Sequence, residues 1–159
     1  MKKWMYWIFP IAWMGMIFYA SAQPYQDQDI KPFLSNYIDL SFLAPYLDWI
    51  TFVYHQSEVS VAALGVLGLI EFFIRKAAHV TVFLILCLAF YFAINKTSKL
   101  IRKYQVLFAL VATIIYAIFD EIHQGFTPNR TPFIGDVFLD SFGACLGVAL
   151  IFIFRRRLL

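Results

Sequence analysis

The chain has 159 residues, of which 62% are hydrophobic and 18 are Phe, and its mean hydropathy is +0.71. Soluble domains contain about 45 to 50% apolar residues, so this composition excludes an ordinary soluble domain and indicates an integral membrane protein. The formal net charge is only +3 and the basic residues are scattered, which gives no sign of a nucleic-acid partner. The length predicts a single domain over residues 1–159.

Four apolar segments are long enough to cross a hydrocarbon core of about 30 Å as helices. They cover residues 4–22, 77–94, 104–124 and 133–154. The sequence therefore predicts an all-α integral membrane protein with four transmembrane helices. The first segment ends in Ala-Ser-Ala, which also fits a signal-peptidase site. Its bulky aromatic residues and internal proline favour a retained span instead.

The segments between these spans have different compositions. Residues 23–60 are rich in Gln, Asp, Pro and Tyr, and predict an extracellular loop containing short helices at the bilayer surface. Residues 61–74 are apolar but too short to cross, and predict an interfacial or partly re-entrant helix. Cys87 and Cys145 lie inside apolar segments without metal-ligand spacing, so both are predicted to be free thiols in the core.

The basic residues predict the orientation. In the four-span arrangement, nine of the 13 fall on one side, and all ten acidic residues fall on the other. The nine are Lys2, Lys3, Lys96, Lys99, Arg102, Lys103, Arg155, Arg156 and Arg157. Because cytoplasmic loops carry an excess of Lys and Arg, we expect a multi-pass protein of the cell membrane with both termini in the cytoplasm.

Polar residues gather where the third and fourth segments meet. Asp120, Glu121 and Gln124 close the third segment, and Asp136 and Asp140 stand one helical turn apart in the fourth. A carboxylate at the centre of a span costs about 2.5 to 3.5 kcal/mol, so such residues normally face the protein interior and have a partner. We therefore interpret this cluster, on the outer side, as the candidate site.

Basic residues and a histidine complete the candidate set. Lys76 and His79 share a helix face at the start of the second segment, and Arg130 lies in the loop before the fourth. Taken singly, Lys76 is also explained as an interfacial residue and His79 as a core histidine. The predicted ligand-binding residues are Lys76, His79, Asp120, Glu121, Gln124, Arg130, Asp136 and Asp140.

The face that carries Asp136 and Asp140 continues into Gly143 and Gly147. This G-x-x-x-G spacing lets another helix approach closely. Two interpretations are open: packing of helices within one protomer, which we favour, or a homo-oligomer interface.

Together these residues resemble the VanZ-like family. The resemblance rests on R-K-x-x-H from Arg75, on D-E-x-x-Q from Asp120, and on Arg130 followed by Asp136 and Asp140. The Ser-Ala-Gln-Pro that ends the first segment is similar to that family's serine and glutamine signature. The resemblance implies a small polytopic bacterial membrane protein of a family associated with low-level resistance to the glycopeptide teicoplanin. It implies no reaction.

Two functions are compatible with the sequence. In the first, the cluster binds an envelope lipid, glycolipid or glycopeptide-type ligand at the outer leaflet and protects the cell envelope. In the second, the protein is a membrane-embedded enzyme that acts on a lipid-linked envelope substrate, with an acid/base pair or a metal held by Glu121, Asp136, Asp140 and a histidine. The chain has no H-E-x-x-H, G-x-S-x-G or Walker motif, so binding is favoured and no catalytic residue or cofactor is assigned.

The charge balance at the cluster limits the chemical classes of ligand that it can bind. Four carboxylates face two cations, Lys76 and Arg130, or three if Arg75 joins them. A protonated carboxylate, a charged histidine or a bound cation must supply the difference. This disfavours a simple anion as the ligand and leaves zwitterionic or hydroxyl-rich groups.

Overall fold

The computed structural model describes residues 2–24, 28–37, 39–128 and 130–154. The chain forms two compact units, which are considered separately. One unit joins Met1–Pro24 to His79–Leu159, and the other is Tyr25–Ala78. The elements of the first unit are η1 (Lys3–Trp7), α1 (Ile8–Ser21), the later part of α4 (Val61–Thr97), α5 (Arg102–Gln124) and α6 (Ile134–Ile153).

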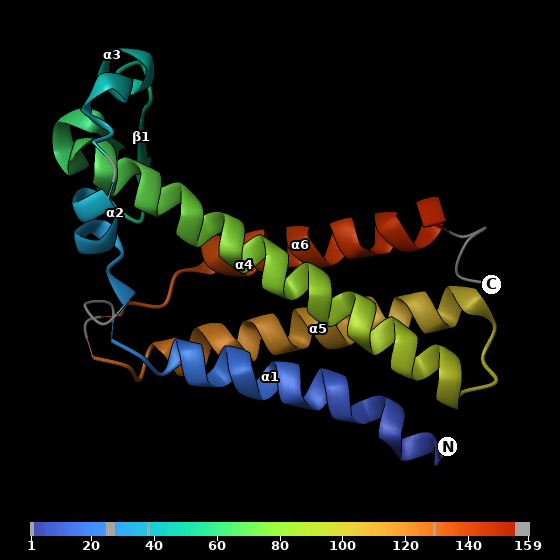
Figure 1. Ribbon diagram of the computed structural model, residues 1–159. Helices are drawn as coiled ribbons and strands as arrows, with labels where there is room; N and C mark the ends of the chain where they lie inside the picture. Colours follow the sequence, from blue (N-terminus) through green and yellow to red (C-terminus); the bar gives the residue numbers. More distant parts are fainter. Residues whose placement is uncertain (1, 25–27, 38, 129, 155–159) are drawn as a thin grey trace. The chain divides into compact units, whose positions relative to one another are not determined.

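Within the described residues, three helices are long and apolar enough to cross a membrane, namely α4, α5 and α6 (Figure 1). The chain is thus a predominantly α-helical membrane protein, as predicted. The first apolar segment forms a shorter α-helix of 14 residues after a 3₁₀ turn of five. By helical rise these add about 21 Å and about 10 Å, so the segment can reach across a bilayer core only if both are used. A fourth crossing stays a prediction.

The prediction that residues 61–74 form a separate interfacial or partly re-entrant helix is wrong. These residues open α4, which is kinked at its one non-helical residue, Gly65 (φ 70° and ψ 171°), and is helical from there to Thr97. Glu71 and Arg75 suggested an interruption, but they stand one turn apart and pair with each other, so their charges do not end the helix. Positive φ is accessible to glycine, which explains the kink at Gly65.

The core of the first unit lies between its four helices. Its buried side chains are Ile17, Phe83, Leu86, Cys87, Phe90, Ile94, Ala109, Tyr116, Ala117 and Ala144. Two long-range hydrogen bonds tie α1 to the others: Trp13 Nε1 donates to the Val82 carbonyl at 2.9 Å, and Tyr116 Oη donates to the Met14 carbonyl at 2.6 Å. Cys87 and Cys145 are free thiols, as predicted, but only Cys87 is buried; Cys145 is exposed, so its predicted place in the core is wrong.

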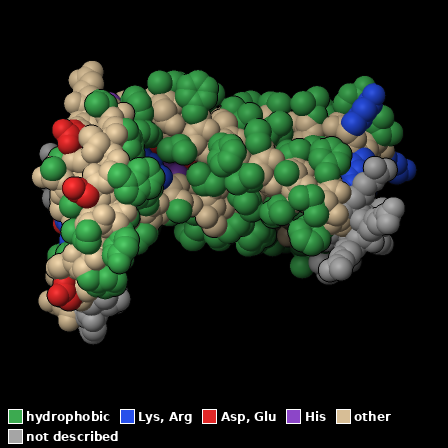
Figure 2. Space-filling view, turned by 90° about the horizontal axis from the view of Figure 1, so that it is seen from above, with side chains coloured by type: hydrophobic (Ala, Val, Ile, Leu, Met, Phe, Trp, Pro, Cys, Tyr) green, Lys and Arg blue, Asp and Glu red, His purple; other side chains and the backbone are tan. Residues whose placement is uncertain are grey.

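The outer surface of this bundle is apolar. Ile115, Phe138 and Ile153 are 62%, 70% and 70% exposed, and hydrophobic side chains cover much of the visible face (Figure 2). An apolar surface of this kind suits contact with lipid. The start of η1, the connection from α4 to α5 and the end of α6 lie at one end of the bundle (Figure 1). Lys and Arg side chains gather there (Figure 2).

The second unit contains short helices, as predicted for this loop, and a β-hairpin that was not predicted. Its elements are α2 (Lys31–Tyr37), η3 (Ser41–Leu43), α3 (Ala44–Leu47), β1 (Thr51–Tyr54), β2 (Ser57–Ser60) and the first part of α4. The strands pair antiparallel, with Tyr54 opposite Ser57. The two turn residues, His55 and Gln56, both have positive φ, at 48° and 63°. Hairpin turns of this type normally carry Asn-Gly or Asp-Gly, so the sequence lacks the usual signal.

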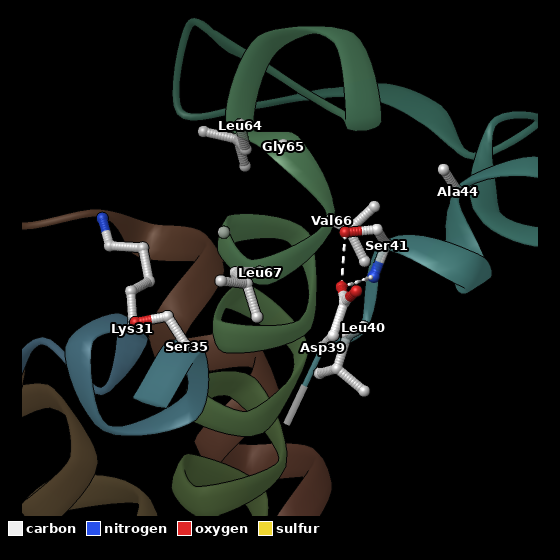
Figure 3. Close-up of a pocket in the computed structure, with 11 residues that line it drawn as sticks. Lys31, Ser35, Asp39, Leu40, Ser41, Ala44, Leu64, Gly65, Val66 and Leu67 are labelled. Atoms are coloured by element: carbon white, nitrogen blue, oxygen red, sulfur yellow. Dashed lines mark hydrogen bonds between the residues drawn. The ribbon is translucent and has the colours of Figure 1, made fainter. Parts of the chain in front are cut away.

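A pocket of about 620 Å³ lies within the second unit (Figure 3). Its polar rim includes Asp39 and Ser41, whose backbone N and Oγ donate to Asp39 Oδ1 at 2.9 and 2.6 Å. These bonds hold the pKa of Asp39 below its usual value. The lining residues are Lys31, Ser35, Asp39, Leu40, Ser41, Ala44, Leu64, Gly65, Val66, Leu67 and Gly68.

Candidate functional site

The end of α5 buries three polar side chains on one face. Asp120, Glu121 and Gln124 are 1%, 5% and 7% exposed, whereas the intervening Ile122 is 57% exposed. Their spacing follows the helical period, so the same face that carries core residues earlier in α5 carries these polar groups. The side chains of Asp120, Glu121 and Gln124 therefore point into the interior of the first unit.

A chain of hydrogen bonds links this face to the following loop. Gln124 Nε2 donates to Asp120 Oδ2 at 2.9 Å, and Arg130 Nη1 donates to Gln124 Oε1 at 3.0 Å. The amide thus bridges the carboxylate and the guanidinium. Because Gln124 can donate and accept at once, it fixes the carboxylate of Asp120 without neutralising its charge.

Glu121 connects α5 to the start of α6. Its Oε1 accepts a hydrogen bond of 2.5 Å from the backbone N–H of Phe133, the residue that precedes α6. No side chain of α6 itself caps this end. A carboxylate is favoured there because the first amides of a helix are unsatisfied and carry partial positive charge. This contact was not foreseen from the sequence, since the two residues belong to different helices.

His79 of α4 pairs with Asp140 of α6. Nδ1 lies 3.2 Å from Asp140 Oδ1, the geometry in which a protonated Nδ1 donates to the carboxylate. Asp140 is fully buried, and the His79 side chain is 26% exposed. The carboxylate orients the imidazole ring and leaves Nε2 on the opposite side.

The two glycines of α6 make this pairing possible. A Cβ at Gly143 would collide with the carbonyl oxygen of Val80, and one at Gly147 would lie 3.0 Å from that of Leu84. Both glycines are buried. Their face is thus occupied by α4 of the same chain, as the interpretation we favoured predicts, and the close approach places Asp140 beside His79.

Each of the three buried carboxyl groups keeps one oxygen without a hydrogen-bond partner. Asp120 Oδ1, Glu121 Oε2 and Asp140 Oδ2 are buried and unpartnered within the described part of the chain. The other oxygen of each group is held, by Gln124, Phe133 and His79 respectively. Leaving a buried acceptor unsatisfied costs about 1 to 3 kcal/mol, and more if it is charged.

These carboxyl groups are close enough to influence one another. Glu121 interacts electrostatically with His79, Asp136 and Asp140, and Asp140 interacts with Asp120 and Asp136 as well as His79. Seven of the eight predicted site residues belong to the first unit, and hydrogen bonds or electrostatic interactions link them to one another.

Among the residues that the structure describes, no group of three His, Cys, Asp or Glu is arranged to hold a metal ion. The metal-binding form of the enzyme hypothesis therefore finds no support in the described residues.

Lys76, the eighth, belongs to the second unit. Its Nζ lies 4.4 Å from the centroid of the Tyr54 ring and 5.5 Å from that of Phe72. Such cation–π contacts suit a lysine of ordinary structural role. A role for Lys76 in the site stays a prediction.

Sequence reasoning missed an ion network in the second unit. Glu71 is 1% exposed; its Oε1 accepts from Arg75 Nε at 2.9 Å and from Nη2 at 2.6 Å. Its Oε2 lies 3.8 Å from Lys31 Nζ, which also pairs with Asp29 at 3.3 Å. Arg75 Nη2 further donates to the Gln28 carbonyl. The i,i+4 spacing of Glu71 and Arg75 was the available signal.

His123 also lay outside the predicted set. Its ring stacks on Phe18 of α1, with centroids 3.9 Å apart, and on Phe119 one turn earlier, at 6.4 Å. Its Nδ1 is buried without a hydrogen-bond partner in the described structure. The ring thus packs α5 against α1. This packing explains why a histidine lies here, and no role at the carboxyl cluster is needed.

The fold and the site define a class: a small polytopic helical membrane protein with a buried carboxylate cluster where three helices meet. The sequence model of the VanZ/LLP1 family matches residues 6–155, nearly the whole chain. The protein therefore belongs to the VanZ/LLP1 family, which confirms the resemblance found in its motifs. Neither a curated protein nor a solved structure matches the chain significantly.

Proposed function

We propose that the carboxylate cluster at the ends of α5 and α6 binds a polar group of an envelope lipid, glycolipid or glycopeptide-type ligand. Through this binding the protein contributes to protection of the cell envelope, in line with the teicoplanin association of its family. One observation carries the proposal: three buried carboxyl groups each hold one oxygen with a protein donor and leave the other unpartnered.

The held oxygens argue for a prepared site. Hydrogen bonds from Gln124, Phe133 and His79 fix each carboxyl group in one orientation, so a ligand meets acceptors that are already placed. A buried acceptor without a donor is costly, and a ligand that supplies donors recovers that cost. A purely structural network would be expected to satisfy both oxygens.

The pair of His79 and Asp140 supports a second candidate function. A carboxylate that holds Nδ1 leaves Nε2 as the atom able to take a proton, which is the arrangement of a general base. A membrane-embedded enzyme could use it on a lipid-linked envelope substrate. Mass spectrometry of lipid extract incubated with purified protein tests this: a new headgroup product that disappears with His79→Asn would favour catalysis over binding.

The proposed function is tested by drug susceptibility. Expression of the wild-type protein in a teicoplanin-susceptible bacterium should raise the inhibitory concentration of teicoplanin. Asp140→Asn should abolish that increase at equal membrane abundance, because the substitution removes a charge but little volume. Asp48→Asn, an exposed position of the second unit, is the control. If Asp140→Asn protects as well as the wild type, the cluster has no part in the effect.

The proposal includes an orientation. Both termini lie in the cytoplasm, and the second unit and the loop from α5 to α6 lie outside. The second unit exposes Phe42, Tyr46 and Trp49 at 64%, 71% and 80%. Aromatic residues of this kind suit the headgroup region. On this view, bromine attached to lipid near the headgroup should quench the fluorescence of Trp49.

A further inference from the structure

We propose that the group which this cluster receives is an ammonium that carries N–H donors, as in a primary amine. The inference rests on the proposed function and specifies the chemistry of its ligand. Its starting point is that the unpartnered atoms of Asp120, Glu121 and Asp140 are all acceptors. A ligand that satisfies them must donate hydrogen bonds, and a primary ammonium supplies three donors from one atom.

The charge balance favours a bound cation over a neutral ligand. Arg75, one of the cations that could have offset the cluster, is committed to Glu71 and Gln28 within the second unit. Among the predicted site residues of the first unit, the four carboxyl groups of Asp120, Glu121, Asp136 and Asp140 exceed the one cation, Arg130, by three when His79 is neutral. Excess negative charge inside a membrane protein is unfavourable unless a cation offsets it. A neutral sugar provides donors but leaves this excess in place.

The arrangement favours a molecular cation over a metal ion. A metal needs several ligands within about 2.0 to 2.6 Å of one point, and the described residues offer no such group of three. An ammonium makes longer hydrogen bonds of about 2.7 to 2.9 Å and tolerates acceptors that are spread around it. A quaternary amine has the charge but no N–H, so it leaves the acceptors unsatisfied.

Two sources offer this chemistry: a phospholipid with an ethanolamine headgroup, and an amine on a glycan or glycopeptide. The shared feature is a cationic nitrogen that donates at least two hydrogen bonds beside polar groups. The distinction is whether the amine arrives anchored in the bilayer or from the aqueous side.

The test compares three phospholipids with identical acyl chains, added to the purified full-length protein in detergent. Phosphatidylethanolamine offers charge and N–H donors, phosphatidylcholine offers charge alone, and phosphatidylglycerol offers hydroxyl donors without positive charge. Native mass spectrometry measures the bound fraction of each. Preferential retention of phosphatidylethanolamine is the expected result. Equal or greater retention of phosphatidylglycerol overturns the ammonium proposal but leaves a headgroup site, and hence the proposed function, intact.

Variants tie the preference to the cluster. Glu121→Gln with Asp140→Asn should weaken binding of phosphatidylethanolamine about tenfold to a hundredfold, because the amides can still form hydrogen bonds to the ammonium but lose the strengthening that a carboxylate charge gives. Asp48→Asn should leave it unchanged. Glucosamine, added in water, separates the sources: if it stabilises the wild-type protein against heating and phosphatidylethanolamine is not retained, the amine comes from a soluble or glycan ligand. Binding that is equal for all lipids and unchanged in the double variant contradicts both the inference and the proposed function.

Discussion

At the scale of residues, each buried carboxyl group of the cluster has one oxygen that accepts a hydrogen bond from the protein and one that, within the described residues, does not. Asp140 is fully buried, and the nitrogen of His79 satisfies one of its oxygens. Gln124 and the Phe133 amide do the same for Asp120 and Glu121. The Gln124 amide and the Phe133 backbone N–H are neutral, so they position the carboxyl groups of Asp120 and Glu121 without cancelling their charge. This is what a site for a polar, donor-rich ligand requires.

The first prediction concerns the histidine. His79→Ala removes the donor to a buried carboxyl group and should lower the free energy of unfolding by about 1 to 3 kcal/mol. His79→Asn can still place an N–H near the position of Nδ1, and should recover part of the loss. Thermal unfolding in detergent, followed by circular dichroism, measures both. Equal stability of the alanine variant and the wild type would show that the pair contributes nothing to the fold.

Part of this site could be predicted from residues alone. Spacing along α5 and α6 placed the acids on interior faces, since the helical period is a local property. The hydrogen bond from Phe133 to Glu121 and the stacking of His123 on Phe18 depend on which helices become neighbours. No local pattern contains that information.

At the scale of elements, the approach of α6 to α4 decides whether the acids meet their partners. Gly143 has no room for a side chain against the Val80 carbonyl, and Gly147 has little against Leu84 and Cys87. The sequence indicated a small-residue seam but left its partner open between another helix and another copy. The structure also shows α4 continuing through Glu71 and Arg75, where paired charges look like a boundary in sequence.

The second prediction follows from this contact. Gly143→Ala should destabilise the protein by about 1 to 3 kcal/mol, the range expected when a methyl group is forced into a packed interface. Gly147→Ala should cost less, because its nearest neighbours stand at 3.0 and 3.1 Å. Gly15→Ala, where nothing lies within 4 Å, is the matched control and should be neutral or stabilising. The melting temperature should therefore be lowest for Gly143→Ala, higher for Gly147→Ala and highest for Gly15→Ala. Any other order would contradict this packing.

At the scale of the whole molecule, the basic residues and the carboxyl cluster belong to opposite ends of the helical bundle. The N-terminus and the α4 to α5 connection lie at one end, and the connection from α5 to α6 lies at the other (Figure 1). In the orientation that we propose from the positive-inside bias, the cluster lies in the outer half of the membrane. Both termini lie on the same side of the membrane only if the short α1 also crosses it, because α4, α5 and α6 alone would give three crossings.

The third prediction tests that orientation. In a background where Cys87 and Cys145 are replaced, Asn36→Cys should react with a membrane-impermeant maleimide added to intact cells. Ser98→Cys should react only after the cells are opened, because its segment is basic and cytoplasmic. External labelling at Ser98 would reverse the orientation and move the cluster to the inner leaflet.

The central claim is that the buried acids form a ligand site and not merely a scaffold, and lipid mass spectrometry of the purified protein tests it most directly. Wild-type protein should retain a polar lipid or glycolipid in stoichiometric amount. Asp120→Asn with Asp140→Asn should lose it and keep its melting temperature within a few degrees, because each amide preserves size and most hydrogen bonding. Retention of the same lipid by the stable double variant would contradict the claim. So would a melting temperature that falls in step with lipid loss, since the acids would then be structural.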